Sequence, residues 1–150
     1  MKKRKILISI FAVSAVCLCP NRIPALAQAS ADVSATVQFS NGQTLPIINL
    51  SDLIGVQSNE IVNVTVQFPV DSAGRPANVA LLDGGRLIDI PSAVTQDGSV
   101  TFRYQATPNA GQNRIIVHGG AEKLCLQFWV LDSANPQNNP PVITPANPEG

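Results

Sequence analysis

The side chains best suited to chemistry lie near the C-terminal end of the chain, in the stretch HGGAEKLCLQFWVLDS at residues 118–133. This stretch holds the only His of the sequence, His118, the only Trp, Trp129, and the cysteine Cys125. A nucleophilic Cys-His mechanism would need both His118 and Cys125. A reactive thiol, however, requires a positive and partly exposed setting, whereas Cys125 stands between two leucines. We therefore expect no catalytic residue and interpret Cys125 as a small apolar side chain.

The other polar residues predict neither a metal site nor a cofactor site. One His and one Cys do not complete a structural zinc site, and no D-x-D-x-D-G calcium loop is present. Asp71, Asp83 and Asp97 lie in turn clusters, where Asp commonly binds its own backbone. The glycine pairs in DGGRL and HGGAE lack the spacing of a phosphate-binding loop. Loose calcium binding between loops is an alternative that the sequence leaves open.

Trp129 is the candidate ligand contact. In the last predicted strand one apolar set faces the core, and Trp129 then faces away from it, beside Gln127; the core set is Leu124, Leu126, Phe128 and Val130. An exposed Trp on a flat sheet can stack on a sugar ring or anchor a protein partner. The alternative is that a loop, the C-terminal tail or the opposite register covers Trp129. As an alternative to sugar stacking, Arg103 and Arg114, on neighbouring strands, would flank Trp129 as a cation–π or adhesive patch.

The N-terminal end has the pattern of a secretory signal peptide. Four basic residues at positions 2–5 precede an apolar run of fourteen residues, 6–19, and small residues follow at Ala25 and Ala27. The run is shorter than the roughly 20 residues of a membrane-spanning helix. We predict cleavage after Ala27, with Ala29 as the alternative, and no membrane span in the mature chain.

Cleavage changes the charge and the cysteine content. The leader carries five of the ten Lys and Arg residues and none of the ten Asp and Glu residues, so the mature net charge is about −5. An acidic chain without a basic patch is unsuited to binding nucleic acid. Of the three cysteines only Cys125 stays, which excludes an intrachain disulfide. An exposed Cys125 would instead link two chains into a disulfide dimer.

Strand signals dominate the mature sequence. Seven or eight short runs of alternating apolar and polar residues are separated by turn clusters, which predicts an all-β, antiparallel β-sandwich over residues 32–132. The first and last strands are expected at the sheet edges, and Pro46 indicates an edge position for the second strand. For residues 51–60 the sequence leaves two alternatives open, a short helical turn or an irregular crossing segment. Residues 133–150, rich in Pro and Asn, are expected to form a disordered tail.

The stretch SVTFRYQATPNAGQNRIIVHGG, followed by LCLQFWVL, resembles the last three strands of bacterial immunoglobulin-like modules. In those modules a strand with aromatic residues leads through a Pro/Gly loop, an apolar strand and a tight turn into a final hydrophobic strand. The paired cysteines and intervening Trp of antibody-type domains are missing. The resemblance implies an immunoglobulin-like fold and a binding or spacer role in the bacterial cell envelope, and it implies no catalytic residues.

We predict a secreted or cell-surface module that is not an enzyme and uses no cofactor. Its role is expected to be structural, adhesive or protein-binding, with an envelope protein or a polysaccharide as the partner. The first alternative is a carbohydrate-binding module centred on Trp129; Gln127, Arg103 and Arg114 are further candidate contacts to a ligand or partner. The second, less favoured, is a secreted hydrolase using His118 or acidic residues.

Overall fold

Apolar and polar residues alternate through most of residues 33–148, the part of the chain that the computed structural model describes, and these stretches form β-strands. Inward positions are mostly β-branched or aromatic, which pack well on a pleated surface. The described residues contain no α-helix and two 3-10 turns, η4 (Val70–Ser72) and η5 (Pro136–Asn138). The strands are β1 (Ser34–Gln38), β2 (Thr44–Ile47), β3 (Leu53–Val56), β4 (Ile61–Gln67), β5 (Ala77–Leu81), β6 (Arg86–Ile88), β7 (Ser99–Gln105), β8 (Gly111–Gly119) and β9 (Glu122–Val130).

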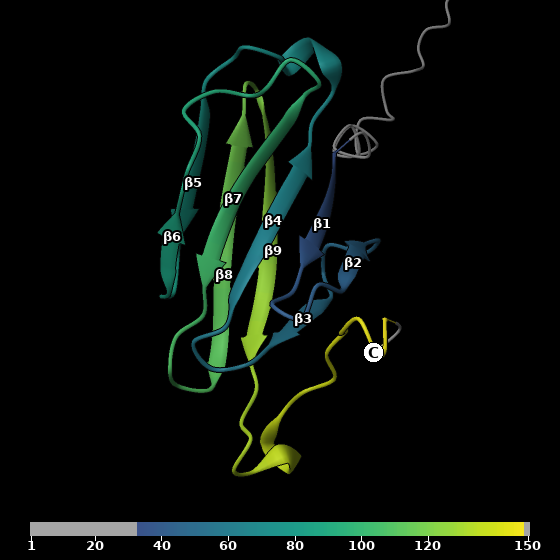
Figure 1. The fold of residues 1–150 in the computed structure, drawn as a ribbon, viewed down its shortest axis with the longest axis vertical. Coiled ribbons are helices and arrows are strands. Elements are labelled where there is room, and N and C mark those ends of the chain that lie inside the picture. Colours follow the sequence, from purple (N-terminus) through teal and green to yellow (C-terminus); the bar gives the residue numbers. More distant parts are fainter. Residues whose placement is uncertain (1–32, 149–150) are drawn as a thin grey trace, which may run out of the picture. The chain divides into compact units, whose positions relative to one another are not determined.

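These strands form two sheets, shown in Figure 1. The first sheet has the order β2-β1-β4-β7-β6, and all of its pairs are antiparallel. The second has the order β3-β9-β8-β5, in which β3 runs parallel to β9. The predicted all-β class is confirmed, and the two sheets are compatible with a β-sandwich. Residues 33–148 contain nine strands instead of the seven or eight predicted. The predicted signal peptide, residues 1–27, lies outside the described residues.

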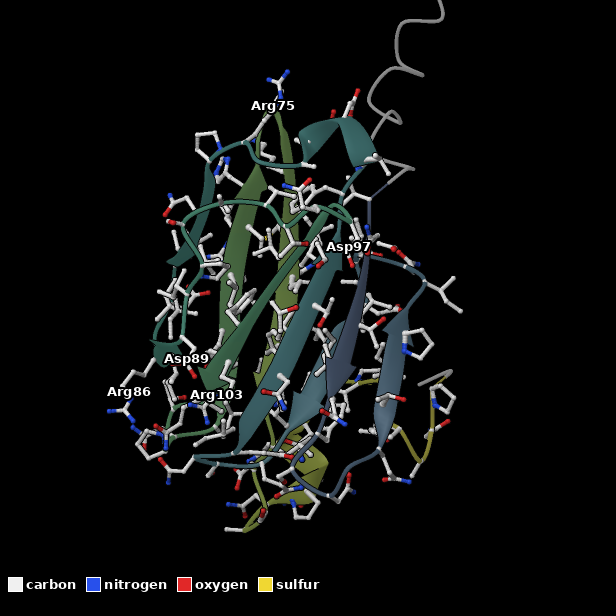
Figure 2. All side chains as sticks on the ribbon, turned by 45° about the horizontal axis from the view of Figure 1, so that its top comes forward. Arg75, Arg86, Asp89, Asp97 and Arg103 are labelled. Carbon is white, nitrogen blue, oxygen red and sulfur yellow. The ribbon has the colours of Figure 1, made fainter. Side chains whose placement is uncertain are left out.

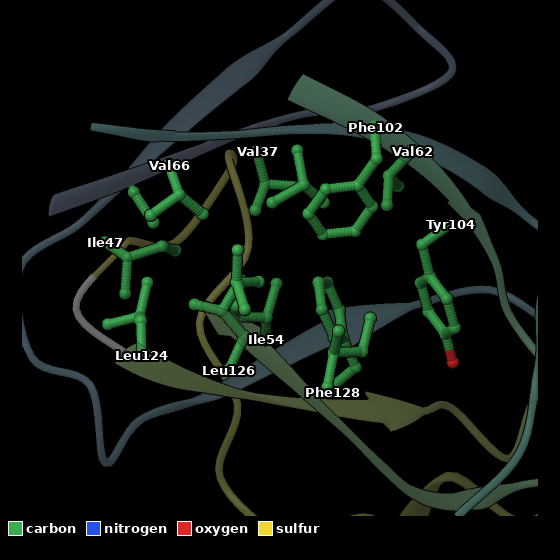
Figure 3. Packing of buried hydrophobic residues seen from close by; sticks show 14 of the residues in the cluster. Val37, Ile47, Ile54, Val62, Val66, Phe102, Tyr104, Leu124, Leu126 and Phe128 are labelled. Carbon is green, nitrogen blue, oxygen red and sulfur yellow. The ribbon is translucent and has the colours of Figure 1, made fainter. Parts of the chain in front are cut away.

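The inward side chains of both sheets build one hydrophobic core (Figure 3). The predicted core face of the last strand is confirmed, because each member of that set is at most 2% exposed; the set is Leu124, Leu126, Phe128 and Val130. Tyr104 of β7 packs against Phe128 across the core, with ring centroids 5.0 Å apart. The buried Tyr104 hydroxyl donates a hydrogen bond to Asn113 Oδ1, so its polar end is satisfied inside the core.

Turns that contain glycine form two hairpins. Asn41-Gly42 joins β1 to β2, and Gly42 adopts a φ of +89°, which glycine tolerates without strain. The second hairpin joins β8 to β9 at Gly119-Gly120. The DGG turn at residues 83–85 differs, because it connects β5 to β6 and these strands belong to different sheets.

The sheet edges differ from the prediction. The first strand, β1, lies between β2 and β4, and the last, β9, lies between β3 and β8, so the expectation that they form edges is wrong. The reason is that the short strands β2 and β3 pair with their outer sides. Strand β3 comes from the segment 51–60, so both alternatives for it, a helical turn and an irregular crossing segment, are wrong for residues 53–56. Pro46 does lie on an edge strand, β2, as predicted.

The C-terminal segment buries more than the sequence indicates. The sequence predicts a disordered tail over residues 133–150, but Ile143 is 5% exposed and belongs to the core. Ile143 pairs in parallel with Ile54 of β3. Gly55 N donates to Ile143 O at 2.9 Å, and Ile143 N donates to Leu53 O at 2.8 Å. Figure 1 shows the chain leaving β9, turning through η5 and returning beside β3. Residues 142–144 are called the edge segment below.

Candidate functional site

Trp129 and Gln127 lie on the outer face of the second sheet, on the side of β9 opposite to the core. Both side chains are half-buried. Trp129 stands in register between Gly55 of β3 and Gln112 of β8. Gln112 Nε2 donates a hydrogen bond to Gln127 Oε1 at 3.0 Å. The outward orientation of Trp129, inferred from the alternation of the last strand, is therefore what the structure has.

The C-terminal residues partly cover Trp129. Its Nε1 donates to Asn139 Oδ1 at 3.2 Å, and the same oxygen accepts from the backbone N of Asp132 at 2.7 Å. Three alternatives were open for what covers Trp129: a loop, the C-terminal tail or the opposite register. The structure shows a contact with the C-terminal tail. Asn139, which holds the indole, lies ten residues after Trp129 and outside the strands. The alternation of a strand gives no information on such a contact, and the sequence analysis did not identify Asn139.

Arg114 lies on the same outer face as Trp129 but is bound to another residue. Its Nε and Nη2 donate to Asp83 Oδ2 at 2.8 Å and Oδ1 at 2.9 Å, and its backbone N also donates to Oδ2 at 2.8 Å. The hydrogen bond from Arg114 lowers the pKa of Asp83, and Asp83 in turn raises the pKa of Arg114. These three hydrogen bonds connect Arg114 of β8 to Asp83, which lies in the loop after β5, and so attach this loop to β8.

Arg103 does not belong to this face. It lies in β7 of the first sheet, whereas Trp129 lies in β9 of the second, so the predicted grouping of Arg103 with Trp129 is wrong. Strands β7 and β8 follow each other in the sequence, but the loop between them crosses from one sheet to the other. Arg103 Nη2 instead forms an ion pair with Asp89 Oδ2 at 2.6 Å, and Figure 2 shows the two side chains together.

His118 of β8 and Cys125 of β9 both lie on the outer face of the second sheet, in two neighbouring cross-strand pairs. His118 is in register with Lys123, and Cys125 is in register with Ile116. The Cys125 side chain is exposed, which corrects the interpretation of it as a packed apolar residue. The alternation that buries Leu124 and Leu126 turns Cys125 outward. Within residues 33–148 no three His, Cys, Asp or Glu side chains come together in a way that would hold a metal ion.

Two further aspartates stabilise turns. Asp97 Oδ1 accepts hydrogen bonds from the hydroxyls of Thr95 and Ser99, and these bonds lower the pKa of Asp97. Asp132 Oδ1 accepts from the backbone N of Asn135 at 3.0 Å and of Ala134 at 3.1 Å, which lowers its pKa as well. The predicted turn role of Asp97 is confirmed, and Asp132 shapes the turn that leads the chain away from β9.

The edge of β3 is built to accept the edge segment. A methyl group at Gly55 would lie 2.8 Å from Val142 Cγ2 and 3.1 Å from Thr144 Cγ2, so a glycine is required for this close approach. Sequence reasoning missed both sides of the contact. Two signals were available: a single glycine inside the apolar run LIGV, which marks close backbone approach, and the β-branched run VIT at residues 142–144.

A groove of about 570 Å³ adjoins this contact. Three segments form it: the β1–β2 turn, the residues from β3 to β4, and the C-terminal segment. Glu60 ties two of them together, because its Oε2 accepts from Ser40 Oγ at 2.9 Å and its Oε1 from Gln57 N at 2.8 Å. The lining is Phe39, Ser40, Asn41, Gln43, Gly55, Gln57, Ser58, Glu60, Leu131, Thr144, Pro145 and Ala146. It is mostly polar and neutral, with Glu60 as its one charged side chain among these residues.

Neither the known protein families nor the curated proteins contain a match to this chain. The structure also has no helix in residues 33–148 with the length and hydrophobicity to cross a membrane.

Proposed function

We propose that this chain is a secreted or cell-surface, non-catalytic module of immunoglobulin-like type, with a structural, adhesive or protein-binding role. The strand order supports the fold assignment. In immunoglobulin domains strands A, B, E and D form one sheet and strands C, F and G the other. Here β1-β4-β7-β6 follows the first order, and β9-β8-β5 follows the second read from G to C. The location follows from the predicted signal peptide at residues 1–27.

The observation that carries the binding role is the way the β3 edge holds the edge segment. Two backbone hydrogen bonds continue the ladder of the second sheet beyond β3, and Ile143 enters the core beside Ile54. This is strand addition to a sheet edge, in which the main chain supplies the hydrogen bonds and a buried side chain supplies the selectivity. We infer that this edge accepts extended protein segments with a β-branched apolar residue at the central position.

The polar groups of the described residues support a non-catalytic role. The carboxylates of Asp83, Asp89, Asp97 and Asp132 each bind an arginine or a turn. His118 faces a lysine across the strand pair, where a catalytic His would need a group that orients it. These four aspartates therefore stabilise turns and ion pairs of the fold.

The test uses an emptied β3 edge. Ile143→Asp places a charge in the core position and is expected to release the edge segment. A fluorescently labelled synthetic peptide of residues 138–148 should then bind this variant of the unit Asp32–Gly150 saturably in an anisotropy titration. This unit contains all the described strands and the whole described core. A variant ending at Ser133 serves the same purpose should Ile143→Asp fail to fold.

The matched control is Gly55→Val with Ile143→Asp, in which the same edge is blocked by a side chain. Binding to the emptied edge but not to the blocked one supports the proposal. A folded Ile143→Asp or truncated variant that binds no peptide, or equal binding to the blocked edge, overturns it.

A carbohydrate-binding role is the second candidate, because Trp129 lies half-buried near the amide groups of Gln112 and Gln127 on the outer face of the second sheet. Aromatic rings with neighbouring amides are suited to sugar recognition. The emission of Trp129 with a panel of cell-wall polysaccharides tests this candidate. A shift with one polysaccharide, together with loss of its binding in Trp129→Ala, would favour it over protein binding.

A further inference from the structure

The groove of about 570 Å³ beside the β3 edge offers few free backbone groups to a ligand. Its walls come from the β1–β2 turn, from residues between 55 and 60, and from the C-terminal segment, which lies beside β3 in Figure 1. Pro145 has no backbone N–H, and the other lining residues except Asn41, Ser58 and Ala146 donate theirs to acceptors within the chain. A peptide that adds a strand binds through such main-chain groups. The groove is therefore unsuited to strand addition.

The free polar groups of the groove belong to side chains. Gln57 and Ser58 are exposed, and neither side chain forms a hydrogen bond with another residue of the range 33–148. Gln43 Oε1 accepts from Asn41 Nδ2 at 2.8 Å, which leaves Gln43 Nε2 without a partner in the same range. A side-chain amide supplies donors and an acceptor, and a hydroxyl supplies both as well. The groove thus presents donors and acceptors together to a ligand.

The charge of the groove favours an uncharged ligand. Glu60 is the one charged residue of the lining, so a phosphate, sulfate or carboxylate group would meet a carboxylate and no Lys or Arg among these residues. The carboxylate of Glu60 is itself engaged, because it accepts from Ser40 Oγ at 2.9 Å and from Gln57 N at 2.8 Å. Glu60 therefore shapes the groove, and the lining residues offer no set of three His, Cys, Asp or Glu side chains for a metal ion.

The size and the apolar part of the groove fit a sugar. Small-molecule sites commonly have volumes of about 300–1,000 Å³, and this groove lies within that range. Leu131, Pro145 and Ala146 add apolar atoms to the lining, and Phe39, 6% exposed, adds a small further area. A pyranose ring carries hydroxyl groups around its rim and C–H groups on its faces. Such a ligand matches a lining of amides and hydroxyls with a limited apolar surface.

We propose that this groove binds an uncharged oligosaccharide, with the side chains of Gln43, Gln57 and Ser58 as its hydrogen-bonding groups. Residues 144–146 form one wall, so the site exists only while the edge segment is seated on β3. Binding of the sugar therefore stabilises the seated segment. Trp129 does not line the groove, so this site is distinct from the Trp129 face.

The experiment titrates the unit Asp32–Gly150 with oligosaccharides in a calorimeter. The neutral probes are tetramers of glucose, galactose, xylose, mannose and N-acetylglucosamine, and the acidic probe is a tetramer of galacturonic acid. At least one neutral tetramer is expected to bind saturably at one site, and the acidic tetramer should bind at least about tenfold more weakly because it meets Glu60. Failure of every neutral tetramer to bind at up to about 10 mM overturns the proposal, as does equal binding of the acidic tetramer.

Substitutions place the bound sugar in the groove. Gln57→Leu and Ser58→Ala should each weaken binding about fivefold, since each removes hydrogen-bonding groups that the fold does not use. The matched control is Gln96→Leu, because Gln96 is also exposed and lies in the turn before β7, next to Asp97, which contacts the far end of β4 from Glu60. This control should bind as tightly as the unsubstituted unit.

The variant ending at Ser133 lacks the wall at residues 144–146 and should lose the sugar. Unchanged affinity in Gln57→Leu overturns the proposal, and so does binding that survives the truncation, because the sugar then lies elsewhere. The peptide test of the proposed function uses an emptied β3 edge, whereas the sugar titration needs the seated segment. Either can therefore fail while the other holds.

Discussion

Gly55→Val is the substitution that tests the β3 edge most directly. The new side chain would occupy space that Val142 Cγ2 and Thr144 Cγ2 now fill, at 2.8 Å and 3.1 Å from the position of the first added carbon. The backbone of Gly55 is not in the left-handed region, so valine meets a steric conflict there and no backbone strain. Valine also has a high strand propensity. We therefore expect the edge segment to leave β3 while the rest of the fold stays intact.

The expected loss of stability is small. Release exposes Ile143, which is 5% exposed in the structure, at a cost of about 2 kcal/mol. The two backbone hydrogen bonds contribute about 1 kcal/mol each, so the gross loss is about 4 kcal/mol. The three released residues regain backbone entropy worth about 1 kcal/mol each. The free energy of unfolding should therefore fall by about 1 kcal/mol.

The assay combines urea unfolding with the emission of Trp129, the only Trp in the sequence. Release of the segment removes the Asn139 bond to the indole and should shift the emission to longer wavelength and raise its quenching. Thr36→Val, on the outer face of the first sheet, is the control for adding a valine to an exposed strand position and should change neither. Native emission and native stability in Gly55→Val would refute the close packing on which the reasoning depends.

Four further predictions follow from single contacts. Tyr104→Phe leaves Asn113 Oδ1 buried with only its weaker contacts to Thr107, so urea unfolding should show a loss of about 1 kcal/mol; an unchanged midpoint would contradict this. Gly119→Ala would place a methyl group 2.6 Å from the buried Phe68 ring and should cost about 1–3 kcal/mol in the same assay, with Ala121→Gly as a control on the same turn. The pKa values of Asp83, Asp97 and Asp132 are lowered from 3.8 in the folded chain, so their contribution to stability is present above pH 3.8 and is lost as the pH falls through the lowered values; Asp97→Asn should weaken this acid dependence, and an identical pH profile would argue against it. The exposed thiol of Cys125 should give a disulfide-linked dimer under oxidising conditions on a non-reducing gel, and Cys125→Ser should abolish that band.

Local patterns in the sequence were sufficient for most of the strands, with β3 as the exception, and for the direction of their side chains. The alternation in VNVTVQF at residues 62–68 buries each valine of β4, and the same period in LCLQFWV separates the core set of β9 from Trp129 and Cys125. This works because successive residues of a strand point to opposite faces whatever its partners are. The hairpin at Asn41-Gly42 was predictable for a similar reason, since positive φ is a property of the residues in the turn.

Pairing between distant strands was not encoded in any local pattern. The sequence placed Arg103 and Arg114 on successive strands, but whether successive strands share a sheet depends on the path of the loop between them. Likewise, β3 had no clear strand signal of its own, because its four residues gain their order from β9 on one side and from the edge segment on the other.

The sequence by itself determined an all-β chain with Trp129 and Gln127 on an outer face, because strand period and burial are local consequences of residue type. Only the tertiary structure decided which strands form the edges, which arginine shares the outer face with Trp129, and that Asn139 and Ile143 fold back onto the second sheet. The proline-rich composition of the C-terminal segment does not indicate that this segment pairs with β3 of the same chain. Residues 142–144 pack against β3 because Gly55 allows the two backbones to approach closely, and this contact forms only when the fold brings the two segments together.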